Sequence, residues 1–130
     1  MSFEALAKWD ALGSSRWSSR IFDFGDGLAA HNIVLSRHGA SSSIYTGMRK
    51  EDFEWVDLLG VAGGITVESW THLVVTIDEA TLKLFQDGEL VGTADAGGWT
   101  PPSMTRTNHY LCKQSWEGYP YLKGAIASLR

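Results

Sequence analysis

The stretch WTHLVVTIDEATLKLFQDGELVG, from Trp70 to Gly92, decides the fold of this chain. It contains two runs in which apolar and polar residues alternate, a pattern typical of β-strands with one buried face. Asp87-Gly88 ends the second run, and Asp-Gly is a strong hairpin signal because both turn positions require positive φ. A third short run follows, from Leu90 to Ala94. The segment therefore predicts a three-stranded antiparallel meander. The residues expected on its buried face are Leu73, Val75, Ile77, Leu82 and Leu84.

The rest of the chain has the same character: short apolar-polar runs separated by clusters of glycine, serine and proline. Many short strands at regular spacing predict a sandwich or barrel. The segment from Glu4 to Leu12 also contains helix formers, but the alternation that starts at Phe3 fits a strand equally well. Besides the meander, the strands expected are Phe3–Trp9, Arg20–Phe24, His31–Arg37, Ser43–Gly47, Phe53–Leu59, Thr107–Lys113 and Leu122–Leu129.

Specific motifs accompany this pattern. The meander reads W-T-H-x-x-x-T-x-D followed by L-K-L-F-x-D-G-x-L-V-G. Further segments, in order, are Phe3-Glu4-Ala5 with Lys8-Trp9, Arg20 to Gly25, Asn32 to Arg37, Thr105 to Asn108 and Tyr121 to Ile126. Together they resemble the laminin-G-like, concanavalin A-like jelly-roll domains of the lectin/glucanase superfamily. The resemblance favours a strand over a helix for the segment that starts at Phe3. It also implies an all-β fold, a two-sheet antiparallel β-sandwich that forms one domain over residues 1–130. Function does not follow from it, because this fold carries lectins and adhesion domains alike.

Composition excludes several classes of protein. The chain has 130 residues, of which 44% are hydrophobic and 20% charged, values ordinary for a globular domain. No apolar run approaches the ~20 residues of a transmembrane helix, so we expect no membrane insertion. A net charge of −4 argues against nucleic acid as a partner. Met1 leads directly into an expected strand, so we expect no signal peptide. The compartment is left open, although the resemblance implies an extracellular or cell-surface protein.

Related jelly rolls include β-glucan hydrolases, so the question is whether two carboxylates of this chain could catalyse glycoside hydrolysis. A retaining glycosidase requires two carboxyl groups about 5–5.5 Å apart. The nearest candidates here are Glu51, Asp52, Glu54 and Asp57. Glu51 and Asp52 are adjacent, and Glu54 and Asp57 are three positions apart, so the members of each of these two pairs point to opposite faces of a strand. We therefore predict that the chain is not an enzyme and has no catalytic residues.

Metal sites are weakly indicated. The four histidines are scattered singly, which does not favour zinc. The resemblance implies a Ca²⁺ site at one end of the sandwich, for which Asp26 and Asn32 are the candidate ligands, with Asp23 just before them. The alternative, which we favour, is that Asp26 forms a turn and Asn32 bonds the backbone. No other cofactor is indicated. The single cysteine, Cys112, stands where the family usually has glycine, and we interpret it as a small buried residue.

The strongest candidate for a ligand site is aromatic. Trp99 lies in a Gly-Gly-Trp-Thr-Pro-Pro loop, and Trp116 and Tyr119 lie in a later loop beside Gln114 and Glu117. Sugars stack their C–H faces on such rings, while amides and carboxylates bind their hydroxyl groups. The alternative is that the rings pack under their own loops. We expect ligand binding on these loops and not on the open sheet face.

The sequence thus predicts a non-catalytic recognition module, with carbohydrate as the favoured ligand and a glycan or glycoprotein as the partner. A protein–protein or adhesion module without a sugar site is the alternative, and a truncated relative without activity is a third. Family members usually have a further strand before Phe3 and a longer last strand. The domain therefore looks trimmed at both terminal strands, as an excised domain would be. Open sheet edges can also pair with another chain, which predicts a homo-oligomer.

Overall fold

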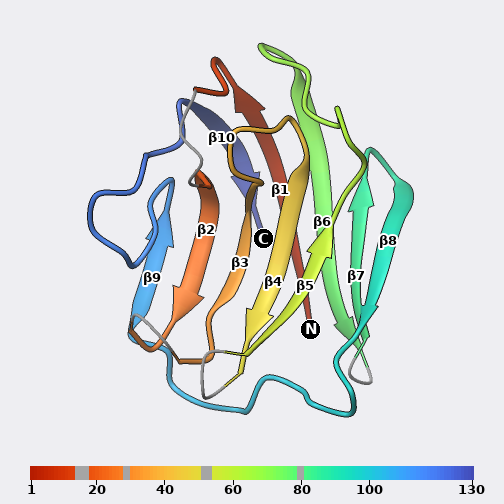
Figure 1. Cartoon of the computed structure of the whole chain (residues 1–130), viewed down its shortest axis with the longest axis vertical. Helices are drawn as coiled ribbons and strands as arrows, with labels where there is room; N and C mark the ends of the chain where they lie inside the picture. The colour runs from red at the N-terminus through yellow and green to blue at the C-terminus, as the bar shows by residue number, and fades with distance from the viewer. Residues whose placement is uncertain (14–17, 28–29, 51–53, 79–80) are drawn as a thin grey trace.

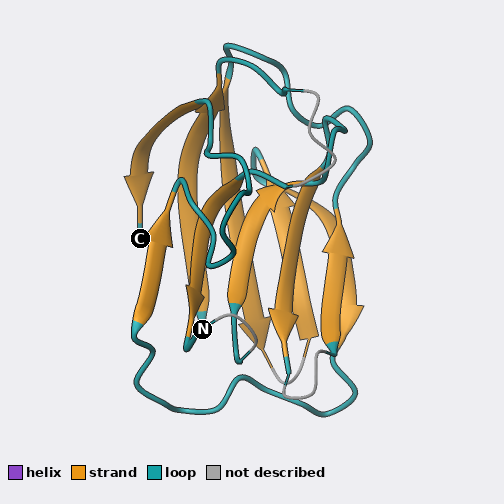
Figure 2. Ribbon diagram, turned by 60° about the vertical axis from the view of Figure 1, so that its left-hand side comes forward, coloured by secondary structure: helices purple, strands orange, loops and turns teal. Residues whose placement is uncertain are grey.

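The fold is a sandwich of two antiparallel β-sheets (Figures 1 and 2). The computed structural model describes residues 1–13, 18–27, 30–50, 54–78 and 81–130. These residues form strands and loops, without a helix that could cross a membrane. The strands are β1 (Ser2–Trp9), β2 (Arg20–Gly25), β3 (Ile33–Arg37), β4 (Ile44–Arg49), β5 (Trp55–Leu59), β6 (Trp70–Asp78), β7 (Thr81–Gln86), β8 (Glu89–Asp95), β9 (Asn108–Leu111) and β10 (Gly124–Leu129). The predicted fold class is confirmed.

Each sheet has five strands. The first sheet has the order β10-β1-β6-β7-β8, and the second sheet has the order β5-β4-β3-β2-β9. The first and last strands of the chain pair with each other in the first sheet, where Ala5 lies opposite Leu129. In Figure 1 the second sheet runs from β9 across to β5, with β1 and β6 of the first sheet behind it.

The predicted meander is β6, β7 and β8, which are neighbours in that order. The turn between β7 and β8 has φ of 51° at Asp87 and 89° at Gly88, as its Asp-Gly sequence requires. All five residues predicted for its buried face belong to the core. The segment from Glu4 to Trp9 is part of strand β1, and its Ala5, Ala7 and Trp9 side chains are completely buried. The strand interpretation of this segment is therefore confirmed over the helix.

Alternation in the second sheet decides which side chains are available for a site. Along β4, Ile44, Thr46 and Met48 are fully buried, and the residues between them point away from the core. Along β5, Val56 and Leu58 are buried while their neighbours are more exposed. The outer face of the second sheet consequently carries Tyr45, Gly47, Arg49, Trp55 and Asp57.

Several strand boundaries differ from the predicted ones. Strands β3 and β10 begin at Ile33 and Gly124, each two residues later than predicted, and β4 and β9 begin one residue later than predicted. Strand β4 continues to Arg49, two residues beyond the predicted end. Strand β9 stops at Leu111, because Cys112 has a φ of 59° and leaves the extended conformation. Glycine is the usual residue for such a backbone, which gives a physical reason for the glycine that the family has there.

Candidate functional site

The loop of residues 113–121 folds back toward the outer face of the second sheet. Its base is closed where the Leu122 amide donates to the Cys112 carbonyl at 3.0 Å, directly after the turn at Cys112. Within the loop, the Ser115 amide donates to Oδ2 of Asp23 at 3.3 Å. Asp23 lies on β2, so this bond holds the loop against the sheet.

Asp23 is the centre of a buried polar group. Its side chain is fully buried, and its Oδ1 accepts a hydrogen bond from Nδ2 of Asn32 at 2.7 Å. Its Oδ2 lies 3.8 Å from Nε of Arg20. Buried carboxylates are tolerated when they are paired and hydrogen-bonded in this way. Asp23 therefore fixes both the loop at Ser115 and the guanidinium of Arg20.

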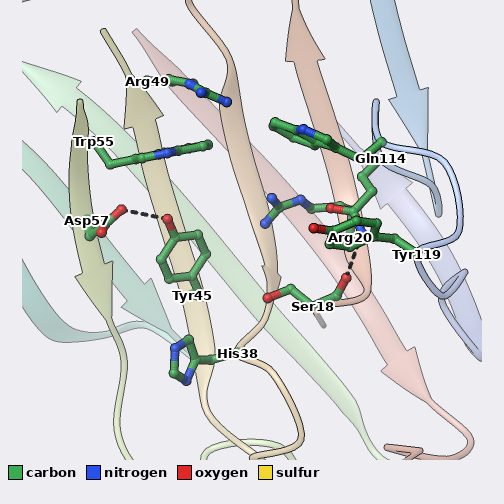
Figure 3. Close-up of a pocket in the computed structure, with 10 residues that line it drawn as sticks. Ser18, Arg20, His38, Tyr45, Arg49, Trp55, Asp57, Gln114 and Tyr119 are labelled. Carbon is green, nitrogen blue, oxygen red and sulfur yellow. Dashed lines mark hydrogen bonds between the residues drawn. The ribbon is translucent and has the colours of Figure 1, made fainter. Parts of the chain in front are cut away.

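Between the 113–121 loop and the sheet lies a cavity of about 460 Å³, which we call the outer pocket (Figure 3). Strands β2, β4 and β5 and the loop all contribute to it, with the segments just before β2 and just after β3. Its lining residues are Ser18, Arg20, His38, Tyr45, Arg49, Trp55, Asp57, Gln114, Trp116 and Tyr119.

Two buried guanidinium groups lie among the rings of the outer pocket. Arg49 is 4% exposed, and its guanidinium carbon lies 5.3 Å from the ring centroid of Trp55 and 5.5 Å from that of Trp116. Arg20 donates from Nη1 to Oγ of Ser36 at 3.1 Å. Burial lowers the pKa of both arginines, and Asp23 acts in the opposite direction on each. Both groups remain charged, because arginine does not deprotonate in proteins.

A tyrosine and a carboxylate form the opposite wall. The Tyr45 hydroxyl donates to Oδ1 of Asp57 at 2.5 Å. Burial, followed by this hydrogen bond, raises the pKa of Tyr45 well above its ordinary value. Gly47 lies between these groups, and a Cβ there would come within 2.8 Å of the Tyr45 hydroxyl and 3.1 Å of Asp57 Oδ1. The bare glycine thus leaves room for the pair.

Three of the five predicted ligand residues line the outer pocket. Trp116 and Tyr119 contribute rings whose centroids lie 6.4 Å apart, and Gln114, which is buried, donates from Nε2 to the Ser18 carbonyl at 3.2 Å. Glu117 is exposed and is not among the lining residues. Trp99 lies away from the pocket lining, half-buried against the hydrophobic core, so it follows the alternative of a ring packed under its own loop.

The sheet supplies a part of the pocket that was not predicted from the sequence. Arg20, Tyr45, Arg49, Trp55 and Asp57 come from three different strands. A signal was present in the sequence, since Tyr45, Trp55 and Asp57 alternate with apolar residues and must point away from the core. The loop and the sheet face build the pocket together, whereas the prediction placed binding on the loops alone.

The candidate calcium ligands serve other contacts. Oδ1 of Asp26 accepts a hydrogen bond from the Thr107 hydroxyl at 2.8 Å. Asn32 is buried and donates from Nδ2 to Asp23 and, at 3.3 Å, to the Gly27 carbonyl. In the described part of the chain, His, Cys, Asp and Glu do not gather in threes as a metal site would need. Calcium binding at Asp26 and Asn32 stays a prediction.

The other singled-out groups have ordinary surroundings. Glu54 is exposed and lies 3.7 Å from Nζ of Lys50. Glu51 and Asp52 lie outside the described residues. Cys112 is half-buried against the core, and burial raises the pKa of its thiol.

Comparisons with known proteins agree with this architecture. The profile of the concanavalin A-like lectin/glucanases superfamily matches residues 1–130. No curated protein matches the chain in sequence. Similar solved structures include the CBM40 domain of the Ruminococcus gnavus IT-sialidase, with a TM-score of 0.75 and 17% identity over 98% of this chain and 72% of that one. The same domain bound to α2,3-sialyllactose (18% identity) and to α2,6-sialyllactose (17% identity) matches with the same TM-score and coverage.

Proposed function

Because the chain belongs to the concanavalin A-like lectin/glucanases superfamily, we propose that it is a non-catalytic carbohydrate-binding module whose outer pocket binds an acidic glycan. One observation carries the proposal: two buried guanidinium groups, of Arg20 and Arg49, lie among four aromatic rings in a single cavity. The rings are those of Tyr45, Trp55, Trp116 and Tyr119.

The aromatic rings of the outer pocket are the reason for proposing a sugar as the ligand. A pyranose presents C–H faces that pack on aromatic rings, and a few polar groups beside the rings then fix its orientation. The polar groups here are the hydroxyl of Ser18, the amide of Gln114 and the carboxylate of Asp57. Trp116 and Tyr119 are held by the loop that Asp23 anchors, so this wall is largely formed before a ligand arrives.

The two arginines are the reason for proposing that this sugar carries an acidic group. A planar guanidinium can donate two parallel hydrogen bonds to one carboxylate, and such charge-assisted bonds are stronger where water is excluded. The Trp55 and Trp116 rings shield Arg49 from solvent in this way. The sialyllactose bound by the similar CBM40 domain carries a carboxylate, which supports the same class of ligand for this chain.

The number of carboxylates in the outer pocket supports a non-catalytic role. Among the described residues that line the outer pocket, Asp57 is the single carboxylate, and its Oδ1 is engaged by the Tyr45 hydroxyl. Glycoside hydrolysis ordinarily needs two carboxyl groups across the scissile bond. We therefore expect no release of reducing sugar from laminarin, lichenan or agarose, and release that is lost in Glu54→Gln would contradict this.

Isothermal titration calorimetry with 3′-sialyllactose, 6′-sialyllactose and lactose tests the proposal. We expect both sialylated sugars to bind and lactose to bind at least about tenfold more weakly, since a hydrogen bond to a charged group contributes about 1.5–3 kcal/mol. Arg49→Gln should remove this preference. Arg49→Lys keeps the charge and should recover only part of it, because lysine lacks the planar pair of donors.

Arg130→Gln is the matched control, because it removes the same charge from an exposed residue at the end of the other sheet. It should leave the affinity unchanged. Equal binding of lactose and sialyllactose, or an equal loss in Arg130→Gln and Arg49→Gln, would refute recognition of the acidic group. A protein that binds none of these sugars, nor any member of a glycan array, would instead favour the protein–protein or adhesion module.

A further inference from the structure

A second cavity, of about 210 Å³, opens at one end of the sandwich, where β1 and β3 end and β10 begins. We call it the end pocket. Its volume corresponds to that of about seven molecules of liquid water, enough for an oxyanion and the atoms that carry it. Its lining residues are Ala11, Leu12, Gly13, Ser19, Arg37, Pro120, Tyr121 and Lys123.

Arg37 is the unusual member of the end pocket. It follows Ile33 and Leu35 on the core-facing side of β3 and is 1% exposed. Among the described residues its side chain makes one hydrogen bond, from Nη1 to the Ser41 carbonyl at 3.5 Å, and its Nε has no partner there. Arg20, which is buried to a similar degree, has the carboxylate of Asp23 beside it.

A buried guanidinium without an anion is costly, because burial removes its water and nothing replaces the lost interaction. Burial lowers the pKa of Arg37, and no carboxylate of the described residues opposes that effect. An oxyanion entering the end pocket would supply the missing counter-charge. Lys123, which is exposed, adds a second cation at the rim, and the Ser19 hydroxyl adds a donor.

The apolar part of the end pocket fits a sugar. Tyr121 is 64% exposed although it is a large ring, and it lies beside Pro120 and Leu12 in the lining. An exposed ring next to a basic group is a suitable surface for the C–H face of a charged sugar. We propose that the end pocket is a second binding site, which takes the carboxylate or sulfate of an acidic glycan. Binding of the oxyanion is inferred from Arg37, Lys123 and Ser19, and the assignment of a glycan as its carrier rests on the function proposed above.

The two pockets share three segments of backbone. Ser18, His38 and Tyr119 line the outer pocket, whereas their neighbours Ser19, Arg37 and Pro120 line the end pocket. The two pockets are therefore adjacent, separated by these shared backbone segments.

The test is an NMR titration of the whole chain with sodium sulfate and, separately, sodium glucuronate, at constant ionic strength kept with sodium chloride. We expect saturable shifts of the Gly13, Ser19, Tyr121 and Lys123 amides and of the Arg37 Nε–H signal. A larger response to glucuronate than to sulfate identifies a carboxylated sugar as the ligand, and the reverse identifies a sulfated one. Shifts that grow linearly without saturation, or that are confined to the outer pocket, would overturn the proposal.

Single substitutions distinguish a loss of binding at the end pocket from a loss of folding. Lys123→Gln changes an exposed residue and should weaken sulfate binding several-fold, while Lys83→Gln, on β7 and outside the lining of the end pocket, should not. Arg37→Gln should abolish the saturable shifts without lowering the melting temperature, because it removes an unpaired buried charge. If Arg37→Gln unfolds the protein, the effect of Lys123→Gln on sulfate binding alone decides whether the end pocket binds an oxyanion. In Trp116→Ala, which damages only the outer pocket, the shifts should persist, so failure of one site is distinguishable from failure of the other.

Discussion

Replacing Asp23 by alanine tests whether the buried polar group at the loop anchor stabilises the fold. The change removes the acceptor of the Asn32 and Ser115 hydrogen bonds and leaves the Arg20 guanidinium buried without its carboxylate. At 3.8 Å the Coulomb attraction to Arg20 is about 4 kcal/mol for an effective dielectric constant of about 20. Removing one partner of a buried pair usually costs about 3–5 kcal/mol, which agrees with that figure.

For 130 residues the entropy of unfolding is about 0.27 kcal/mol/K, so this loss corresponds to a fall in melting temperature of about 11–18 °C. Circular dichroism during thermal and guanidinium unfolding measures both quantities. Asp26→Ala is the matched control, because Asp26 is exposed and makes one side-chain bond to Thr107; it should change the stability by less than about 1 kcal/mol. If Asp23→Ala costs no more than Asp26→Ala, the assignment of Asp23 as the anchor is wrong.

Three further predictions concern the rings, the tyrosine and the sheet edges. Trp116→Ala should weaken sialyllactose binding by about 1–3 kcal/mol, whereas Trp99→Ala should lower the melting temperature and leave the intrinsic affinity unchanged. Calorimetry and thermal unfolding of both variants distinguish these outcomes. Normal binding by Trp116→Ala would contradict the sugar site. The pKa of Tyr45 is higher in the folded chain than its ordinary value of 10.0, so its contribution to stability is complete below pH 10 and declines as the pH rises toward the folded value. Tyr45→Phe should therefore remove part of the alkaline loss of stability in urea, and an identical pH profile would count against the Tyr45–Asp57 bond. Self-association through the edge strands β5, β8, β9 and β10 stays a prediction, and a strictly monomeric sedimentation profile at high concentration would speak against it.

The sequence was sufficient for the fold because the signals of the fold are local. The alternation along β6 and β7 identifies the buried face, and Asp87-Gly88 identifies the turn, from residues that are adjacent in the chain. The loop half of the outer pocket was also predictable, since Trp116 and Tyr119 lie a few residues apart among glycine, serine and proline.

The outward direction of Tyr45, Trp55 and Asp57 was predictable from alternation, but their meeting with the arginines was not, because it depends on which strands are neighbours. Arg20 and Arg49 lie 29 positions apart in the sequence, and only the order β4-β3-β2 brings them to one face. A register shift between Arg20 and Phe22 also breaks the simple alternation that would have indicated where Arg20 points. Its burial hides it further, since charged residues are usually expected at exposed positions.

Gly47 gives the outer pocket a property that concerns its evolution. The position faces away from the core, and the Tyr45 hydroxyl and Asp57 Oδ1 occupy the space that a side chain would need there. One base change in a glycine codon can introduce alanine, valine or serine at this position. Such a change would displace Tyr45 and Asp57, and so reshape the wall of the pocket, while the apolar interior kept its composition. The specificity of the proposed sugar site can therefore diverge between closely related chains without any change to the residues that hold the two sheets together.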